Sequence, residues 1–292
     1  MQPMTCFKLT FAACVCAAMV GCGNDSGTDA DKGKSAAAPA KTAEVVIYTN
    51  ADEEAQIAMK NALDKNGMKG AYLIQSFGTS ELGGKLAAEG KNIEADVVTL
   101  STYYLDSFQK KEKLFADLQN KAKTIQPSPS YWTPILGNTG ALFVNTEVLK
   151  QSKLEAPKSI ADLAKPEYAG HISVPDIMGS STSWLMTQAV MSAQGEEAGA
   201  KTVAAIEKNA GAHLEKSGSG PLKKLRAGEA AVGFGLRHQA VADKARGLPI
   251  NYIDPTEGNF QLQEAAAVVD KGAKTNPNAQ KVVEIIVKYG RP

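Results

Sequence analysis

The sequence has little cysteine, and all of it lies near the start of the chain. Its four cysteines are Cys6, Cys14, Cys16 and Cys22, so residues 23–292 contain none. A chain without paired cysteines builds neither a disulfide framework nor a thiolate-bound metal cluster. The fold must therefore depend on a hydrophobic core, which a chain of 292 residues is long enough to form.

The sequence also lacks an excess of basic charge and is poor in aromatic residues. Lysine and arginine number 32 against 31 aspartates and glutamates, and aromatic residues make up 6% of the chain. Proteins that bind nucleic acid need a basic surface and often stack bases on aromatic side chains. We therefore expect no nucleic-acid partner.

Motifs for catalysis and metal binding are missing as well. The sequence contains no Gly-x-Ser-x-Gly nucleophile motif, and Gly218–Pro221 lacks the Gly-Lys-Ser/Thr ending of a phosphate-binding nucleotide loop. His171, His213 and His238 do not have the spacing of metal ligands. We expect neither an enzyme nor a cofactor or resident metal.

The apolar run near the start of the chain is too short to cross a bilayer. Leu9–Val20 falls well below the roughly 20 residues that a membrane helix needs, so it is typical of a signal-peptide core. Met19–Cys22, which follows it, resembles a bacterial lipobox, in which the cysteine is lipidated and becomes the new amino terminus. We predict a signal peptide over residues 1–21, then lipidated Cys22 and a polar, flexible linker to residue 43.

From residue 44 onward, short apolar segments alternate with amphipathic ones. Strands are predicted at Val45–Tyr48, Tyr72–Phe77 and Ala95–Leu100, with helices after each. Strands that alternate with helices in this way form a parallel sheet covered on both faces.

A second unit repeats this pattern. It is predicted to contain strands at Gly140–Asn145, His171–Pro175, Ala231–Phe234 and Ile250–Ile253, and helices after Gly179, around Ala200–Lys208, at Leu222–Arg226 and at Arg237–Ala245. A strand at Ala265–Val269 and a helix after Pro277 return to the first unit. We expect an α/β fold of two lobes, residues 44–145 with 255–292 and residues 146–254, joined by crossing strands around a ligand cleft.

Several segments resemble the periplasmic solute-binding proteins of ABC importers, in the group that binds ferric iron, phosphonates and polyamines. The segments are Val45–Asn50, Phe77–Leu82, Gly140–Thr146, Gly228–Gly233 and Asp254–Gly258. Within that group, three further segments look most like proteins assigned to 2-aminoethylphosphonate: Gly78–Gly83, Gly179–Trp184 and Gly235–His238.

This resemblance implies a periplasmic-binding-protein fold and a role in transport. A small phosphonate would be captured outside the inner membrane by closure of the two lobes. The implied partners are an ABC permease and its ATPase subunits, and the membrane through Cys22. We expect a monomer. Presentation of the bound ligand to a sensor protein is an alternative that the sequence does not separate from transport.

Hydroxyl side chains gather where three predicted helices begin. They are Thr79-Ser80, Ser101-Thr102 and Ser180-Ser181-Thr182. In an open α/β sheet the ligand crevice lies at the carboxyl ends of the strands, where free N–H groups of helix starts bind oxyanions. Each cluster alone could equally be an ordinary helix cap. The three together predict an anion site.

Other residue types could complete the site. Arg237 and His238 follow a strand, and a guanidinium group matches a phosphonate bidentately, although Arg237 could also form a surface ion pair and His238 could pack or cap. For an ammonium group, the candidates are the aromatic faces of Tyr48 and Tyr103 and the carboxylates of Asp52 and Glu257, with Asn50 beside them.

Ferric iron is the alternative ligand. Iron-binding members of the group resemble one another in an adjacent tyrosine pair after the Gly-Glu-Ala strand, a place that reads Leu236-Arg237-His238 here. A pair does occur at Tyr103-Tyr104, in the other lobe. The sequence therefore favours the phosphonate.

Overall fold

The structure is a computed structural model that describes residues 44–119, 124 and 127–290. The predicted signal peptide, Cys22 and the linker lie outside these residues. Among the described residues, no helix has both the length and the apolar character that a membrane span requires.

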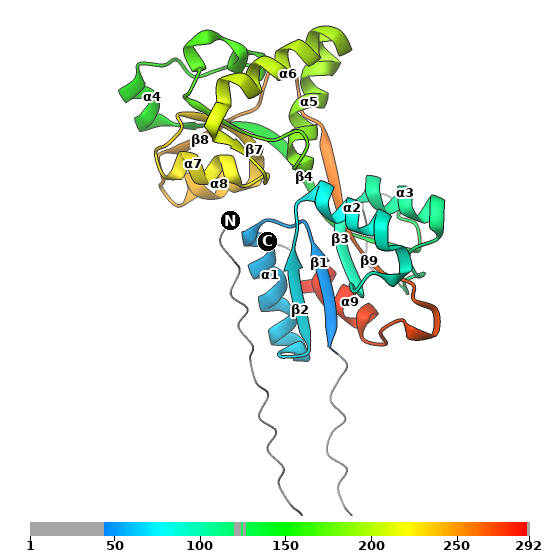
Figure 1. The fold of residues 1–292 in the computed structure, drawn as a ribbon. Helices are drawn as coiled ribbons and strands as arrows, with labels where there is room; N and C mark the ends of the chain where they lie inside the picture. Colours follow the sequence, from blue (N-terminus) through cyan, green and yellow to red (C-terminus); the bar gives the residue numbers. More distant parts are fainter. Residues whose placement is uncertain (1–43, 120–123, 125–126, 291–292) are drawn as a thin grey trace, which may run out of the picture. The chain divides into compact units, whose positions relative to one another are not determined.

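The first lobe begins with three strands, each followed by a helix (Figure 1). In chain order these are β1 (Val45–Thr49), α1 (Glu53–Leu63), β2 (Tyr72–Ser76), α2 (Thr79–Glu89), β3 (Val97–Ser101) and α3 (Thr102–Glu112). A π-helical turn, Asp64–Met68, follows α1, and a 3-10 turn, Gly90–Asn92, follows α2. The predicted alternation of strand and helix is confirmed here.

The second lobe is reached through the long strand β4 (Thr133–Asn145) and helix α4 (Thr146–Ser152). It then contains β5 (Ile172–Pro175), α5 (Ser181–Gln194), α6 (Glu196–Ala210), β6 (Leu214–Glu215), α7 (Gly220–Arg226), β7 (Val232–Leu236), α8 (Arg237–Ala245) and β8 (Ile250–Ile253). Short 3-10 turns lie at Ala161–Ala164, Pro166–Tyr168 and Gly211–His213. Strand β9 (Gln261–Val268), the 3-10 turn Gly272–Lys274 and helix α9 (Ala279–Tyr289) return to the first lobe.

Within the described residues, the strands follow the order β2-β1-β3-β9-β4-β7-β5-β6, and β8 also pairs with β4. Strands β1, β2 and β3 are parallel, as predicted, but β9 joins β3 in the antiparallel direction. Strand β4 pairs with β9 through Thr133–Thr139 and then with β7 from Gly140 onward. Strands β4 and β9 are therefore the crossing strands between the lobes.

The predicted boundary at residue 145 requires a correction. The second half of β4 already belongs to the second lobe, because Gly140–Val144 pairs with β7 and Leu142 and Val144 pack in that lobe's core. A strand that pairs with a different neighbour at each end cannot be assigned to one lobe. The change of partner falls between Thr139 and Gly140.

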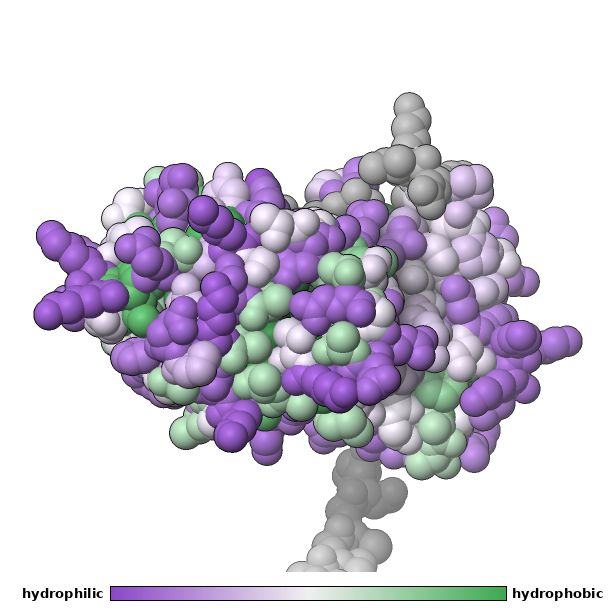
Figure 2. Space-filling view, turned by 90° about the horizontal axis from the view of Figure 1, so that it is seen from above, coloured by the Kyte–Doolittle hydropathy of each residue, from purple (hydrophilic) through white to green (hydrophobic). Residues whose placement is uncertain are grey.

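Each lobe has its own hydrophobic core. The first is built around Val45, Ile47, Leu86 and Leu100, and the second around Phe143, Ile206 and Phe234. The face of the molecule in Figure 2 is largely hydrophilic, with apolar residues in small separate patches. Each core is therefore self-contained, and strands β4 and β9 connect the two lobes.

Candidate functional site

A cavity of about 880 Å³ lies where the two lobes meet. Its walls come from the start of α1, the start of α2, the start of α5 and the loop after β6, and the crossing strands contribute Asn138 and Glu264. The strands β1 and β2 end beside it, so their carboxyl ends direct these helix starts toward one space. This is the location that the topology of an open α/β sheet favours for a ligand.

The starts of α2 and α5, which belong to opposite lobes, are in direct contact at the wall of the cavity. The hydroxyl oxygens of Thr79 and Ser181 are 3.2 Å apart, and the backbone N–H of Ser181 donates to Thr79 Oγ1 at 3.4 Å. The backbones are also close, since a Cβ added at Gly78 would lie 3.4 Å from the carbonyl oxygen of Gly179. Two positive helix ends thus converge, an arrangement that attracts an anion.

The start of α5 is fixed locally by a cap and by a glycine. The Ser180 hydroxyl accepts from the backbone N–H of Thr182 at 3.2 Å. The loop after β6 passes so close that a Cβ at Gly218 would lie 2.0 Å from Thr182 Oγ1. Only glycine allows this approach, and it brings the neighbouring Ser217 and Ser219 to the cavity wall.

Glu264 lies at the centre of the site. It is 9% exposed, and its Oε1 accepts from Asn50 Nδ2 at 3.3 Å and from Ser181 Oγ at 3.5 Å. Burial raises the pKa of this carboxyl from 4.5 to about 7, although the hydrogen bonds from Asn50 and Ser181 act in the opposite direction. The loss of hydration therefore outweighs the hydrogen bonds.

The other charged side chains of the cavity are mainly acidic. Of the described residues that line it, the basic one is Lys216, and the remaining acidic ones are Asp52, Glu81, Asp176 and Glu215. An anion would therefore bind at the helix starts and near Lys216, while a cationic group would find carboxylates close by.

Six of the residues predicted from the sequence line this cavity. They are Asn50, Thr79, Ser80, Ser180, Ser181 and Thr182. They come from the ends of β1 and the starts of α2 and α5. The carboxylate of Asp52 lines it too, while also capping α1 by accepting from the backbone N–H of Ala55 at 2.9 Å.

The aromatic candidates and the start of α3 do not line the cavity. Tyr48 is buried in the first lobe, where its hydroxyl donates to Glu94 at 2.8 Å and burial raises its pKa to about 12. Ser101 is 2% exposed and lies opposite Glu264 in the sheet. Thr102 follows it in α3, and Tyr103 is 77% exposed on that helix. The third predicted hydroxyl cluster therefore contributes nothing to this wall, because β9 lies beside β3 and presents Glu264 instead.

The three remaining candidates lie elsewhere in the second lobe, which corrects their predicted place at the cavity. Arg237 forms two hydrogen bonds with Asp254, at 2.8 and 3.1 Å, and its guanidinium carbon stacks 4.5 Å from the centre of the Tyr252 ring. His238 is exposed. Glu257 accepts from the backbone N–H groups of Ile160 and Ala161, so it caps a 3-10 turn. The surface ion pair, open as the alternative for Arg237, is the observed arrangement.

Sequence reasoning missed Glu264, Asn138, the carboxylate of Asp176 after β5 and that of Glu215 at the end of β6. One sequence feature could have pointed to Glu264, because it is a charged residue directly before the apolar run Ala265–Val269. No feature of the sequence marks Asn138 as a cavity residue, because its position depends on β4 crossing between the lobes. The Ser217–Ser219 loop also lines the cavity.

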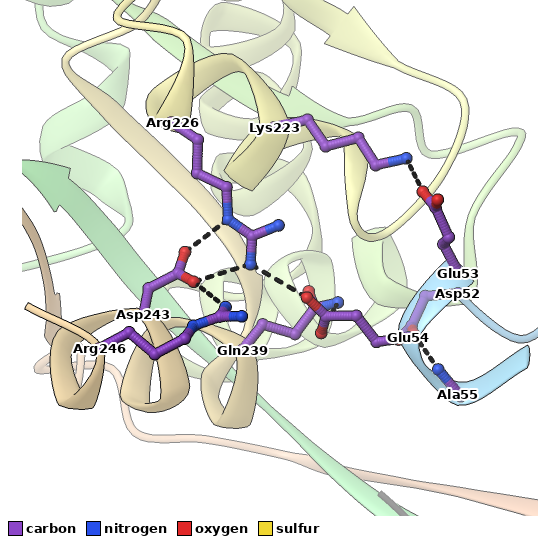
Figure 3. Close-up of polar contacts among 9 residues, drawn as sticks. All are labelled: Asp52, Glu53, Glu54, Ala55, Lys223, Arg226, Gln239, Asp243 and Arg246. Carbon is purple, nitrogen blue, oxygen red and sulfur yellow. Dashed lines mark hydrogen bonds and ion pairs between the residues drawn. The ribbon is translucent and has the colours of Figure 1, made fainter. Parts of the chain in front are cut away.

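Beside the cavity, charged residues connect the lobes directly (Figure 3). Lys223 Nζ lies 2.7 Å from Glu53 Oε2, and Arg226 Nη2 donates to Glu54 Oε1 at 3.1 Å. The Arg226 guanidinium is itself oriented by the fully buried Asp243, which accepts at 2.6 and 2.9 Å. We refer to Glu53, Glu54, Lys223 and Arg226 as the interlobe ion pairs.

Further contacts support this arrangement. Gln239 Nε2 donates to Glu54 Oε2 at 3.4 Å, and Arg246 also bonds to Asp243. Glu53 and Glu54 stand in the first turn of α1, directly after the cavity residue Asp52. Lys223 and Arg226 belong to α7, which follows the cavity loop Ser217–Ser219. The interlobe ion pairs are therefore linked to two walls of the cavity.

Comparison with protein families identifies the chain. Residues 93–288 match the model of a family of bacterial extracellular solute-binding proteins. The chain belongs to this family. Its two lobes, its crossing strands and its interlobe cavity are what a solute-binding protein requires.

Individual relatives of this solute-binding protein are distant. A Fe(3+)-binding periplasmic protein of Serratia marcescens is 29% identical over 213 residues, which covers 69% of this chain and 59% of that protein. The matched regions span 40 to 59% of the length of the curated relatives.

Solved structures confirm the two-lobed α/β fold of the solute-binding protein. The periplasmic binding protein AfuA from Actinobacillus pleuropneumoniae, with fructose-6-phosphate bound, has a TM-score of 0.71 and 22% identity, covering 85% of this chain and 80% of that one. Iron-bound HitA from Pseudomonas aeruginosa has a TM-score of 0.62 and 20% identity, with 84% and 80% covered. At these identities the likeness concerns the fold alone.

The raised pKa of Glu264 predicts how stability depends on pH. The folded protein keeps this carboxyl neutral up to about pH 7, whereas the unfolded chain ionises it near 4.5, so its contribution to stability is lost as the pH rises between these values. Glu264→Gln should leave stability nearly unchanged at pH 4 and raise the free energy of unfolding at pH 8 by roughly 2–3 kcal/mol relative to the wild type. Urea unfolding at both pH values measures this, and a difference independent of pH would contradict it.

Proposed function

We propose that this solute-binding protein is the capture component of an ABC importer and that its ligand is a small aminophosphonate, 2-aminoethylphosphonate or a close relative. The observation that carries the proposal is the meeting of the α2 and α5 starts, from opposite lobes, at hydroxyl groups 3.2 Å apart. A ligand that bridges these two helix ends would bind both lobes at once.

An oxyanion suits this position for electrostatic reasons. Each helix start carries a partial positive charge, and each contributes about 0.3–1 kcal/mol to anion binding, or up to about 2 kcal/mol when partly buried. The hydroxyl of Ser80 would add a hydrogen bond to a phosphonate, and Lys216 a full positive charge.

The acidic side chains favour a ligand that is also cationic. A simple dianion would be repelled by Asp52, Asp176, Glu215 and ionised Glu264, all of which line the cavity. A zwitterion avoids this repulsion, because its ammonium group can approach a carboxylate while its phosphonate occupies the helix starts. The similarly folded AfuA binds fructose-6-phosphate, which supports the view that this fold accommodates a phosphorus oxyanion.

The two crossing strands would allow the protein to capture its ligand by closure of the lobes. Bending of β4 and β9 near Thr139 would open the cavity to solvent, and the ligand would favour the closed state by contacting both lobes. We infer that the protein binds its ligand without chemical turnover and works as a monomer with a permease and an ATPase. Presentation to a sensor remains compatible with the same closure.

Ferric iron is the second candidate, because the relative from Serratia marcescens binds Fe(3+). The described residues that line the cavity include neither tyrosine nor histidine, and no group of three histidine, cysteine, aspartate or glutamate side chains placed to hold a metal ion occurs in the described part of the chain. Tyr103, with 77% of its surface exposed, lies on α3 away from this wall. These observations favour the phosphonate over iron.

Substitutions of Ser181, which lines the cavity, and of Arg237, which the sequence favoured, should show which of the two residues contributes to ligand binding. Ser181→Ala removes the hydroxyl that contacts both Thr79 and Glu264 where the two helix starts meet, so the affinity for 2-aminoethylphosphonate should fall about tenfold or more. Arg237→Ala, whose guanidinium is bound to Asp254, should leave it within about twofold. Isothermal titration calorimetry measures both variants.

The same titrations test the ligand class. Inorganic phosphate and ferric citrate serve as the competing probes, and tinted protein after incubation with ferric ion would indicate iron-tyrosinate. Strong ferric binding without phosphonate binding would refute the aminophosphonate. A loss of affinity in Arg237→Ala, with none in Ser181→Ala, would place the ligand outside this cavity.

The interlobe ion pairs should contribute to closure without touching the ligand. Glu54→Gln weakens the contact with Arg226 and lowers the closed fraction, so we expect a loss of ligand affinity of roughly two- to fivefold, smaller at 1 M salt. Glu197→Gln is the matched control, because Glu197 pairs with Lys201 within one helix of the second lobe. Equal affinities for the two variants at low salt would show that the pairs do not assist closure.

We also propose that Cys22 carries a lipid anchor, on the basis of the lipobox-like Met19–Cys22. In a bacterial host, Cys22→Ala should move the protein from the membrane fraction to the soluble extracytoplasmic fraction and abolish its labelling by radioactive palmitate. A wild-type protein that is not labelled would exclude the anchor.

A further inference from the structure

Glu264 differs from the other acidic residues of the cavity in being both buried and incompletely bonded. Its Oε1 accepts from Asn50 of the first lobe and Ser181 of the second. Its Oε2 is buried and has no hydrogen-bond partner among the described residues. Of the ion pairs between described residues, none involves Glu264.

A buried polar atom without a partner is unfavourable, so its persistence calls for an explanation. Glu264 stands on β9, where the next residues, Ala265 to Val268, are fully packed in the core. An apolar residue at position 264 would fit this strand without the cost of burying a carboxyl. Because the side chain lines the ligand cavity, the missing partner can come from the ligand.

The other acidic side chains that line the cavity are partly engaged elsewhere or more exposed. Asp52 accepts from Ala55 N–H, Glu81 from Gly78 N–H and Asp176 from Met178 N–H. Glu215 is only half-buried, and the one basic side chain on the described wall, Lys216, is exposed. All five are titratable groups that share the cavity with Glu264, and Asp52 adds to the raised pKa of its carboxyl.

We propose that Glu264 is the specificity-determining residue of this cavity, accepting a hydrogen bond through Oε2 from the ammonium group of the solute. This inference rests on the proposed function and goes further, because it predicts that the protein selects phosphonates with an amine over those without one. The hydrogen bonds from Asn50 and Ser181 hold the carboxyl between the two lobes, so the ammonium group is recognised where the lobes meet.

Selection arises because an ammonium group and a carboxylate stabilise each other, whereas a phosphonate without an amine leaves the carboxyl unpaired. The ammonium group also favours the ionised form of Glu264, so binding near neutral pH should release a proton. The preference for the amine should therefore increase as the pH rises through 7.

The test compares 2-aminoethylphosphonate with ethylphosphonate, which has the same head group and no amine. Calorimetry on the wild type, Glu264→Gln and the control Glu197→Gln gives three affinity ratios. We expect the wild type and the control to prefer the amine at least tenfold, and Glu264→Gln to prefer it threefold or less. Affinity for ethylphosphonate should stay within about threefold in all three proteins.

The pH dependence gives a second readout that a purely structural role would not produce. The affinity ratio, corrected for the separately titrated ionisation of each free phosphonate, should increase at least threefold from pH 6 to pH 8 in the wild type and stay flat in Glu264→Gln. If Glu264→Gln does not fold, the wild-type ratio alone decides, and a flat ratio overturns the proposal.

The measured affinities distinguish failure of the role of Glu264 from failure of the proposed aminophosphonate function. Binding of both phosphonates with the same preference in the wild type and in Glu264→Gln would overturn the role of Glu264 and leave the aminophosphonate function standing. If the folded wild type binds neither phosphonate, the proposed ligand class and the role of Glu264 both fall.

Discussion

The convergence of two helix starts from opposite lobes is the constraint on which the site depends. The positive ends of α2 and α5 are brought together at Thr79 and Ser181, with the backbones of Gly78 and Gly179 in close approach. Like-charged helix ends repel each other unless negative charge lies near them. The cavity supplies such charge from its carboxylates, and the proposed ligand would supply more of it in a form that both lobes can bind.

The crossing strands make this convergence possible and, in the proposed mechanism, allow it to open. Strand β4 changes partner from β9 to β7 between Thr139 and Gly140, so the lobes share strands but keep separate cores. The interlobe ion pairs add a second set of contacts beside the cavity (Figure 3). Such pairs are individually weak, which suits a protein that must release what it captures.

Proteins of this fold bind different solutes, as an iron-bound and a fructose-6-phosphate-bound structure illustrate. The scaffold supplies helix starts at the carboxyl ends of strands, and the side chains there decide what is bound. In this chain the polar side chains described there are hydroxyls, amides, one lysine and several carboxylates, and our proposal of a zwitterionic ligand rests on this composition. Glu264 stands out among them because its burial makes the charge state of the cavity sensitive to its contents.

The sequence by itself determined the order of strands and helices, the two-lobed fold and the hydroxyl-rich starts of α2 and α5, because periodicity and capping are local properties. It predicted the position of α8 correctly but placed Arg237 in the site. In the structure, Arg237 lies outside the cavity and forms hydrogen bonds with Asp254. Only the tertiary structure decided that Asn138 and Glu264 face the cavity and that Ser101 and Tyr103 do not line it. The physical reason is that these placements depend on which strands pair across the lobes, and pairing between distant segments leaves no mark on the local pattern.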